Sequence, residues 1–396
     1  MAMTAAEIEL ELEYSFHAKL LAGSVAQRVP LNGTLELTFR CNYNCVHCYV
    51  NLPTGDRVAK ARELTTAEWK RIIDEIAEAG CFYLLITGGE FMLRPDWQEI
   101  YLHVKKQGII PMLYTNGSAI TSEIADFLVE YPPRSMEITL YGATRETYEA
   151  VTRLPGSFDK ALRGINLLLE RRIPLKLKSV ALKSNFHELS QMKYYTEGLG
   201  LNFFYDPHIN IRIDGQAYPL EQRLTPAEII LMDLEQNERA ERTIEICTGM
   251  NENPQALSKD AFTCGAGQVS FTVDPFGIAS TCQIVRKPGV DLRRNSFEYA
   301  WNVVFNQLRQ TQRSGTQRCD SCDIQQSCTQ CAGWSMMEYN DYETPNDWLC
   351  EVNHARHEAF NPIYQPGAGQ RTILLSSLSS SKAGSKTKQA QVIVAV

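Results

Sequence analysis

Three cysteines lie within eight residues of the stretch RCNYNCVHCY, residues 40–49. Cys41, Cys45 and Cys48 follow the spacing Cx3Cx2C, and His47 directly precedes the last of them. Zinc would need a fourth ligand, and His47 is badly placed because adjacent residues rarely chelate one tetrahedral ion together. Electron-transfer clusters normally take four thiolates. Three thiolates therefore favour a [4Fe–4S] cluster in which one iron stays free to bind another molecule.

A second set of cysteines occupies the C-terminal part of the chain. The stretch 319–331 has the spacing Cx2Cx5Cx2C, which by itself is also typical of a zinc ribbon. The whole set consists of Cys264, Cys282, Cys319, Cys322, Cys328, Cys331 and Cys350. Two cysteines stand apart, Cys81 and Cys247. Cys81 begins an apolar run and is expected to be a small core residue.

The composition is that of an ordinary soluble protein. The 396 residues carry a net charge of −7, which gives no support for a nucleic-acid surface. No run of 18 uncharged apolar residues is present, so no membrane span is expected. The N-terminal residues lack the basic and apolar regions of a secretory signal. We therefore expect a cytoplasmic location, where clustered thiols indicate metal ligation in preference to disulfides.

Six apolar strands alternate with amphipathic helices over the first half of the chain. The pattern predicts strands at 34–39, 82–87, 108–117, 135–142, 174–182 and 201–212. Helices are expected between them at 65–80, 96–107, 121–131, 159–172 and 186–198. This alternation is typical of parallel βαβ units in an open sheet or a barrel. The first cysteine set follows the first strand, at the edge of the sheet where α/β proteins bind ligands.

The remaining segments complete the expected organisation. Residues 7–16 alternate between acidic and apolar and predict an edge strand, and helices are expected at 225–239 and 296–310. The Ser- and Lys-rich stretch 376–391 is typical of disorder. The expected units are an N-terminal extension (1–33), an α/β region (34–215), a helical bridge (216–260), a cysteine-rich region (261–360) and a disordered tail (361–396).

Cx3Cx2C after the first strand and Gly88-Gly89-Glu90 after the second resemble the motifs of the radical S-adenosylmethionine (radical SAM) superfamily. The resemblance covers residues 34–212 and implies a partial (β/α)6 barrel whose open iron chelates S-adenosylmethionine. Reductive cleavage would then yield a 5′-deoxyadenosyl radical that abstracts hydrogen from a substrate. Glu90 would pair with the methionyl ammonium, while the glycines permit close backbone approach.

Further cofactor contacts follow from the same resemblance. His47 would pack near the adenine, and Thr139 in SMEITLYG matches a serine that hydrogen-bonds the methionyl carboxylate. Tyr141 replaces an acid of the family pattern, and we nominate it as a catalytic residue. Arg153 and Ser179 stand where relatives bind the cofactor, although both could equally be solvated.

The order of the C-terminal cysteines resembles the SPASM domain, with x2 in place of x3 in the last spacing. The resemblance implies two auxiliary [4Fe–4S] clusters, hence three clusters in all. The distal one would be held by Cys319, Cys322, Cys328 and Cys350, and the proximal one by Cys264, Cys282 and Cys331. Either Cys247 closes the proximal cluster, which we favour, or that iron is open to a substrate group.

SPASM proteins mostly modify peptides, so the first hypothesis is maturation of a ribosomally synthesised precursor peptide by crosslinking, rearrangement or excision. A sulfatase-type maturase is disfavoured because Gln283 stands where those enzymes place an aspartate base, and Gln cannot take a proton. Tetrapyrrole processing, as in haem biosynthesis, is the alternative outside the peptide class. An electron-transfer protein would not explain the Gly88-Gly89-Glu90 motif.

Partners and substrate contacts complete the predictions. About 33 residues precede the first barrel strand, too few for a winged-helix module that binds the peptide leader. We expect a separate leader-recognition protein, or strand addition to residues 7–16, and an electron donor of flavodoxin or ferredoxin type. Polar residues of the sixth strand are plausible substrate contacts, with Asp206 a candidate catalytic residue: Tyr205, Asp206, His208 and Arg212.

Overall fold

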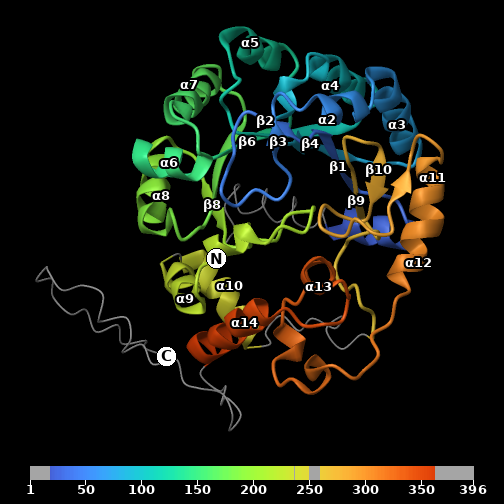
Figure 1. Cartoon of the computed structure of the whole chain (residues 1–396), viewed down its shortest axis with the longest axis vertical. Coiled ribbons are helices and arrows are strands. Elements are labelled where there is room, and N and C mark those ends of the chain that lie inside the picture. The colour runs from blue at the N-terminus through green and yellow to red at the C-terminus, as the bar shows by residue number, and fades with distance from the viewer. Residues whose placement is uncertain (1–17, 236, 249–258, 362–396) are drawn as a thin grey trace, which may run out of the picture.

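The computed structural model describes residues 18–235, 237–248 and 259–361. The strand predicted at 7–16 and the tail from 362 onward lie outside the described residues. The described chain is built on a curved sheet with helices along its outer side, and the cysteine-rich segments lie across the opening of the curve (Figure 1). Among the described helices, none combines the length and apolar character needed to cross a membrane.

Six parallel strands form the body of the sheet, which confirms the predicted α/β class. They follow one another in the order β1-β4-β5-β6-β7-β8, each parallel to its neighbour. Their bounds are β1 Asn32–Thr38, β4 Tyr83–Gly88, β5 Ile110–Thr115, β6 Ser135–Thr139, β7 Leu175–Val180 and β8 Phe203–Asp206. The carboxyl ends of these strands therefore share one edge, where the first cysteine set begins.

The helices between the strands bury apolar faces against the sheet. In α3 (Thr66–Glu78), Thr65 and Glu68 form a capping box, and the buried face carries Trp69, Ile72 and Ile76. The others are α2 Arg57–Arg62, α4 Trp97–Lys106, α5 Ser122–Glu130, α6 Arg145–Thr152, α7 Ser157–Glu170 and α8 Leu189–Gly198. Short helical turns are η1 Phe91–Leu93, η2 Phe186–Glu188 and η3 Tyr218–Gln222.

The sixth strand is much shorter than the prediction of 201–212. β8 ends at Asp206, because Pro207 has no N–H to donate to the ladder and disfavours its continuation. The following segment, including His208 and Arg212, leaves the sheet as irregular chain. The side chains of this segment therefore need not alternate between the two faces of the sheet.

The C-terminal half adds three strands to the same sheet, which the sequence did not predict. β9 (Ser270–Val273) pairs in parallel with β1, from Asn32 opposite Ser270 onward. β10 (Ile278–Ser280) and β11 (Val290–Asp291) continue the sheet in antiparallel pairing. The orange strands beside β1 in Figure 1 show this join. The cysteine-rich segment that follows β10 is thus anchored to the first barrel strand.

Helices cover the opposite end of the sheet. The predicted helix 225–239 is two helices, α9 (Pro226–Leu234) and α10 (Asn237–Cys247), against which α14 (Asp347–Phe360) packs (Figure 1).

The predicted helix 296–310 is α11 Phe297–Tyr299, η5 Ala300–Val304 and α12 Phe305–Arg309 in succession. The remaining elements are η6 Arg318–Ser321, η7 Gln325–Ser327 and α13 Ala332–Tyr339.

Candidate active site

The first cysteine set lies on a loop pinned at both ends. β2 (Arg40–Cys41) pairs with β3 (Leu52–Pro53), so the intervening residues form a closed loop over the carboxyl edge of the sheet. Cys41, Cys45 and Cys48 all contact the main apolar core. The Cys48 backbone N–H donates to the Cys45 carbonyl at 3.2 Å, and the Tyr43 N–H lies 3.3 Å from Cys41 Sγ. The three thiols therefore face a common, largely dehydrated space.

The electrostatics of these thiols fit a cationic ligand. Burial raises the pKa of Cys41 to about 12 and that of Cys45 well above its usual value. Burial also raises the pKa of Cys48, and the thiols raise one another's pKa further. Metal ligation requires thiolates, and a bound iron–sulfur cluster would supply the positive charge that the site lacks. Cys45 is buried and Cys41 and Cys48 are partly buried, so three thiolates in this loop would be costly without a positive charge beside them.

Gly88 and Gly89 allow two chain segments to touch. At Gly88, with φ +132°, an added Cβ would lie 2.2 Å from the Thr38 carbonyl oxygen, and at Gly89 it would lie 2.4 Å from the Arg40 carbonyl oxygen. The Gly89 N–H donates to Thr38 O at 2.6 Å, and the Glu90 N–H donates to Arg40 O at 2.9 Å. The glycines thus bring Glu90 beside the backbone that leads into Cys41.

Glu90 is fully buried and held by three donors. Its carboxylate accepts from Thr115 Oγ1 at 2.8 Å, from the Asn116 N–H at 2.9 Å and from the Met92 N–H at 3.3 Å. Burial raises the pKa of Glu90 despite these hydrogen bonds. A cationic ammonium group is the partner that such a carboxylate requires. Thr115 and Asn116 were missed from the sequence, although TNG at the end of the third strand is a turn signal that could have drawn attention to them.

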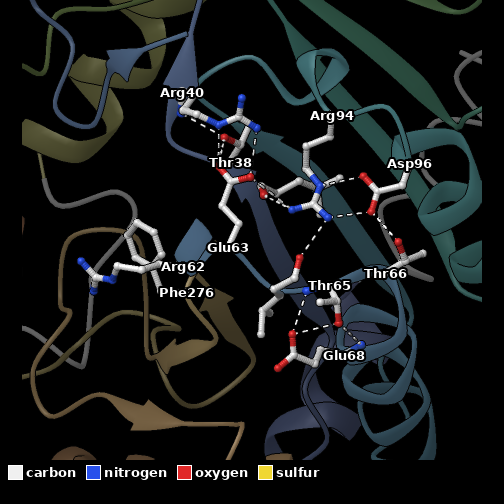
Figure 2. A network of polar contacts seen from close by, with 12 residues as sticks. Thr38, Arg40, Arg62, Glu63, Thr65, Thr66, Glu68, Arg94, Asp96 and Phe276 are labelled. Atoms are coloured by element: carbon white, nitrogen blue, oxygen red, sulfur yellow. Dashed lines mark hydrogen bonds and ion pairs between the residues drawn. The ribbon is translucent and has the colours of Figure 1, made fainter. Parts of the chain in front are cut away.

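A buried ion network fixes the approach to Cys41 (Figure 2). Arg40 donates to both carboxylate oxygens of Glu63, at 2.9 and 3.0 Å, and Thr38 Oγ1 donates to the same carboxylate. Arg94 reaches Glu63 at 3.5 Å and donates to the Leu64 carbonyl at 3.0 Å and to Asp96 at 2.7 Å. This network ties the end of β1 to the segment that follows Glu90. Sequence reasoning did not find it, because its members are far apart in the chain.

His47 and Tyr141 lie together above the sheet. Their rings are 5.4 Å apart and tilted by 49°, and Tyr141 also contacts Tyr148. Burial lowers the pKa of His47 to about 4, and His47 Nδ1 is buried without a hydrogen-bond partner among the described residues. Burial raises the pKa of Tyr141 well above its usual value, so its phenol stays protonated. A neutral aromatic pair of this kind suits contact with a flat heterocycle.

The other predicted cofactor contacts are less closely gathered. Thr139 ends β6 and is partly buried, with Lys178 as its neighbour on β7. Ser179 is buried, and its hydroxyl donates to the Leu140 carbonyl at 2.7 Å. Arg153 is exposed in the left-handed cap of α6, with φ 54°. The structure thus places Thr139 at the shared edge, whereas the Ser179 hydroxyl is already engaged.

Arg212, predicted as a substrate contact, instead braces the cysteine loop. It donates to the Cys48 carbonyl at 3.3 Å and to the Asn51 carbonyl at 3.2 Å, and it pairs with Asp214 at 3.0 Å. Its side chain is only 8% exposed. The Tyr205 hydroxyl likewise donates to the Met232 carbonyl at 2.7 Å. Both therefore hold the frame of the site in this structure.

The C-terminal cysteines gather in two places. Five of them line a small cavity of about 100 Å³, Cys331 among them. The other four influence one another electrostatically: Cys319, Cys322, Cys328 and Cys350. The Gln330 side-chain amide lies 3.1 Å from Cys350 Sγ. The second place holds Cys264, Cys282 and Cys331, which also influence one another. The backbone N–H groups of Val285 and Ile284 point at Cys282 Sγ, at 3.2 and 3.4 Å, as donors do toward cluster thiolates.

Cys247, the expected fourth ligand of the proximal set, lies elsewhere. It ends α10 and packs in an apolar cluster with Ile230, Ala355 and Phe360. Its electrostatic neighbours are Arg356 and Asp233, and none of the other cysteines is among them. The structure therefore does not bring Cys247 to Cys264, Cys282 and Cys331.

His354 was missed by the sequence reasoning. Its Nε2 lies 3.7 Å from Cys322 Sγ, and together with Asp323 these side chains offer three metal-ligating atoms within 4.8 Å of one another. His354 is four residues beyond Cys350 on α14, so the two share a helix face. The only signal in the sequence is this i, i+4 spacing.

A cavity of about 400 Å³ lies between the first cysteine set and the proximal set; we call it the central cavity. It takes residues from the cysteine loop, from the segment after β8 and from the C-terminal region. Its lining consists of Tyr49, Asp206, His208, Asn210, Gln283, Ile284, Thr329, Cys331, Trp334 and Leu349. Cys331 of the proximal set lines the cavity itself, while Tyr49 and Gln283 are the residues that follow Cys48 and Cys282 in the chain. It is the natural place for a substrate.

A comparison with known protein families matches the part of the chain that holds the cysteine loop. The sequence model of the radical SAM superfamily matches residues 35–192, which contain the cysteine loop and Glu90. This segment of the chain is a radical SAM domain. Radical SAM proteins bind a [4Fe–4S] cluster and S-adenosylmethionine, in keeping with three gathered thiols beside a buried carboxylate.

Two kinds of relatives are similar to this chain in sequence, a heme synthase and a mycofactocin maturase. The AdoMet-dependent heme synthase of Methanosarcina barkeri is 34% identical over 165 residues, 42% of this chain and 46% of the relative, so the match spans about half of that protein. The mycofactocin maturase MftC of Mycobacterium tuberculosis is 28% identical over 323 residues, 76% of this chain and 77% of the relative.

Among solved structures, SuiB of Streptococcus suis bound to S-adenosylmethionine has a TM-score of 0.62 at 14% identity, covering 88% of this chain and 83% of SuiB. SuiB has also been solved bound to its precursor peptide SuiA, with a TM-score of 0.61 and 14% identity, covering 86% of this chain and 81% of SuiB. At this identity the likeness concerns the fold. It extends over both the barrel and the C-terminal region.

Proposed function

We propose that this chain is a radical SAM/SPASM maturase that modifies a ribosomally synthesised precursor peptide. The observation that carries the proposal is the central cavity, which is lined by Cys331 of the proximal set and by Tyr49, the residue after Cys48. The match to mycofactocin maturase MftC supports it, because that match covers 76% of the chain and therefore extends well beyond residues 35–192. SuiB, which shares the fold, is a protein that has been captured with a precursor peptide.

The proposed roles follow the geometry. Cys41, Cys45 and Cys48 would hold the cluster that binds S-adenosylmethionine, which on reduction supplies a 5′-deoxyadenosyl radical that abstracts hydrogen. Glu90 would accept the methionyl ammonium, with Gly88 and Gly89 forming the backbone beside it. His47 would pack on the adenine. Secondary contacts are proposed for Thr139, Arg153 and Ser179, and Tyr141 would act only as a neutral hydroxyl donor.

Two auxiliary [4Fe–4S] clusters are proposed in the C-terminal region. Cys319, Cys322, Cys328 and Cys350 would hold the distal one. Cys264, Cys282 and Cys331 would hold the proximal one and leave its fourth position open, since Cys247 packs elsewhere. Because Cys331 lines the central cavity, that open position would lie close to the substrate.

The proposal is tested by coexpression with short peptides encoded near this gene, followed by mass spectrometry of each peptide. A mass change in one peptide that requires intact Cys45 supports the proposal. Any separate leader-recognition protein would show itself as a partner that tightens binding of the peptide to this chain. Electrons would come from a donor of flavodoxin or ferredoxin type, for which dithionite can substitute in the assay.

Tetrapyrrole processing is the second candidate, favoured by the 34% identity to a heme synthase over 165 residues. That match covers only 42% of the chain. If the reconstituted chain converts an iron porphyrin and leaves all the peptides unchanged, this candidate replaces the first.

A further inference from the structure

The central cavity contains few groups that can accept a proton. Gln283 cannot, and the Tyr49 hydroxyl already donates to Glu36 Oε1 at 3.2 Å. Cys331 belongs to the proximal cysteine set. Among the lining residues this leaves Asp206 and His208.

Asp206 and His208 form a hydrogen-bonded pair. Asp206 Oδ1 lies 2.6 Å from His208 Nδ1 and also accepts from the His208 backbone N–H at 2.9 Å. Desolvation in the cavity raises the pKa of Asp206, but the hydrogen bonds from His208 outweigh it, and the pKa lies below its usual value. An ionised carboxylate only accepts, so Nδ1 carries a proton, and in the neutral imidazole Nε2 then carries the lone pair. Asp206 is itself a weak base, and it sets the tautomer of a stronger base, the His208 imidazole.

The imidazole is held in place by two indoles. Its ring meets Trp334 at 5.5 Å and Trp348 at 6.2 Å, nearly perpendicular to both, and the two indoles stack on each other at 5.7 Å. Arg223 lies over both indoles, so this wall is itself braced. The His208 side chain remains 38% exposed, which leaves it reachable from the cavity.

We propose that His208, through Nε2, is the proton acceptor for the substrate in the central cavity, and that Asp206 is its positioning residue. This inference rests on the proposed function and moves the catalytic role from Asp206, as first predicted, to its neighbour. It also explains how the site can work with Gln283 in the place of an acid, because another residue that lines the same cavity supplies the base.

The step balances as a two-electron oxidation of the peptide. One hydrogen atom leaves a C–H bond to the 5′-deoxyadenosyl group. One electron passes to an oxidised iron–sulfur centre, the class of acceptor that Cys264, Cys282 and Cys331 would hold. One proton leaves a neighbouring X–H bond, where X is nitrogen, sulfur, oxygen or carbon, and goes to His208 Nε2. The electron pair of that X–H bond forms the new bond to the oxidised carbon.

The test uses the reconstituted holoenzyme with the peptide whose mass changes on coexpression. His208→Gln should lower modified peptide by about 100-fold or more, the range for a lost general base, while 5′-deoxyadenosine formation stays within about twofold. His208→Ala should regain product when imidazole is added. Asp206→Asn should lose product without rescue by imidazole. The control is His103→Gln, since His103 also pairs with an aspartate, Nε2 to Asp74 Oδ1 at 2.6 Å, but does not line the cavity, and this variant should behave as wild type.

A second readout does not depend on turnover. Diethylpyrocarbonate should label His208, and bound peptide should protect it while the 65% exposed His187 stays labelled. The proposal is overturned if His208→Gln forms product at the wild-type rate, if imidazole restores nothing to His208→Ala, or if peptide leaves His208 labelling unchanged. If the wild type makes 5′-deoxyadenosine but never modifies the peptide, the proposed function fails and this inference falls with it.

Discussion

Glu63 offers the sharpest test of how the fold holds the cysteine loop. Its carboxylate, 5% exposed, is the shared anion of Arg40 and Arg94, whose side chains are 6% and 7% exposed (Figure 2). In Glu63→Gln the shape is kept but the charge is lost. Arg94 still has the carboxylate of Asp96 at 2.7 Å, whereas Arg40 is left with neutral acceptors, one amide oxygen and the Thr54 carbonyl at 3.5 Å. One buried cation is then uncompensated.

Removing one partner of a buried pair costs about 3–5 kcal/mol, out of a total stability of about 5–15 kcal/mol. With an m value of about 3 kcal/mol/M, the urea midpoint should fall by about 1–1.7 M. The assay is urea unfolding of the reduced apo chain, followed by circular dichroism and by tryptophan fluorescence.

The matched control is Glu99→Gln. Glu99 pairs with Lys70 at 2.6 Å, but the two side chains are 59% and 34% exposed, so water screens the pair. Its loss should cost about 0–1 kcal/mol. If Glu63→Gln destabilises the chain no more than Glu99→Gln does, the network does not hold the loop as described.

Four further predictions follow from the same contacts. Gly88→Ala should lower the unfolding midpoint and weaken cluster retention, because its Cβ would lie 2.2 Å from the Thr38 carbonyl oxygen, while Gly55→Ala, with no atom within 4 Å, should do neither. Glu90→Gln should weaken S-adenosylmethionine binding by about 10- to 150-fold, the value of a charged hydrogen bond of about 1.5–3 kcal/mol, measured by equilibrium dialysis; unchanged affinity would remove Glu90 from the site. Cys247→Ser should keep the full iron content of about twelve per chain expected for three clusters, and a loss of iron would return Cys247 to the ligands. Burial raises the pKa of Asp274 to about 6, so the folded chain binds the extra proton between about pH 4 and pH 6. The free energy of unfolding should therefore fall by roughly 2–3 kcal/mol as pH rises through that window, and Asp274→Asn should abolish this slope in urea titrations of the apo chain.

Local sequence patterns predicted the parts of the fold that depend on neighbouring residues. The helix predicted at 65–80 depends on residues a few positions apart, and the structure has it as α3. The six parallel strands were likewise visible as apolar runs between helices. Pro207 marks the true end of β8, and a stricter reading of its missing N–H would have shortened the predicted strand.

Long-range features could not be predicted in this way. β9 has four residues and pairs with β1 across more than two hundred positions, so nothing in its own pattern gives its partner. Glu63 reads as a surface helix end until Arg40 and Arg94 are brought to it. The cysteine spacing suggested which thiols belong together but not that Cys247 packs with Phe360. His208 was one polar residue among several until Asp206 and two indoles oriented it.

The central claim is that Cys41, Cys45 and Cys48 hold a cluster that cleaves S-adenosylmethionine. The most direct measurement is 5′-deoxyadenosine and methionine formed by the anaerobically reconstituted chain with dithionite and S-adenosylmethionine, read by mass spectrometry. We predict equal amounts of the two products from the wild type and none from Cys45→Ser, which should also lose about four irons. Cleavage that persists in Cys45→Ser, or a wild type that binds iron yet yields no 5′-deoxyadenosine, would contradict the claim.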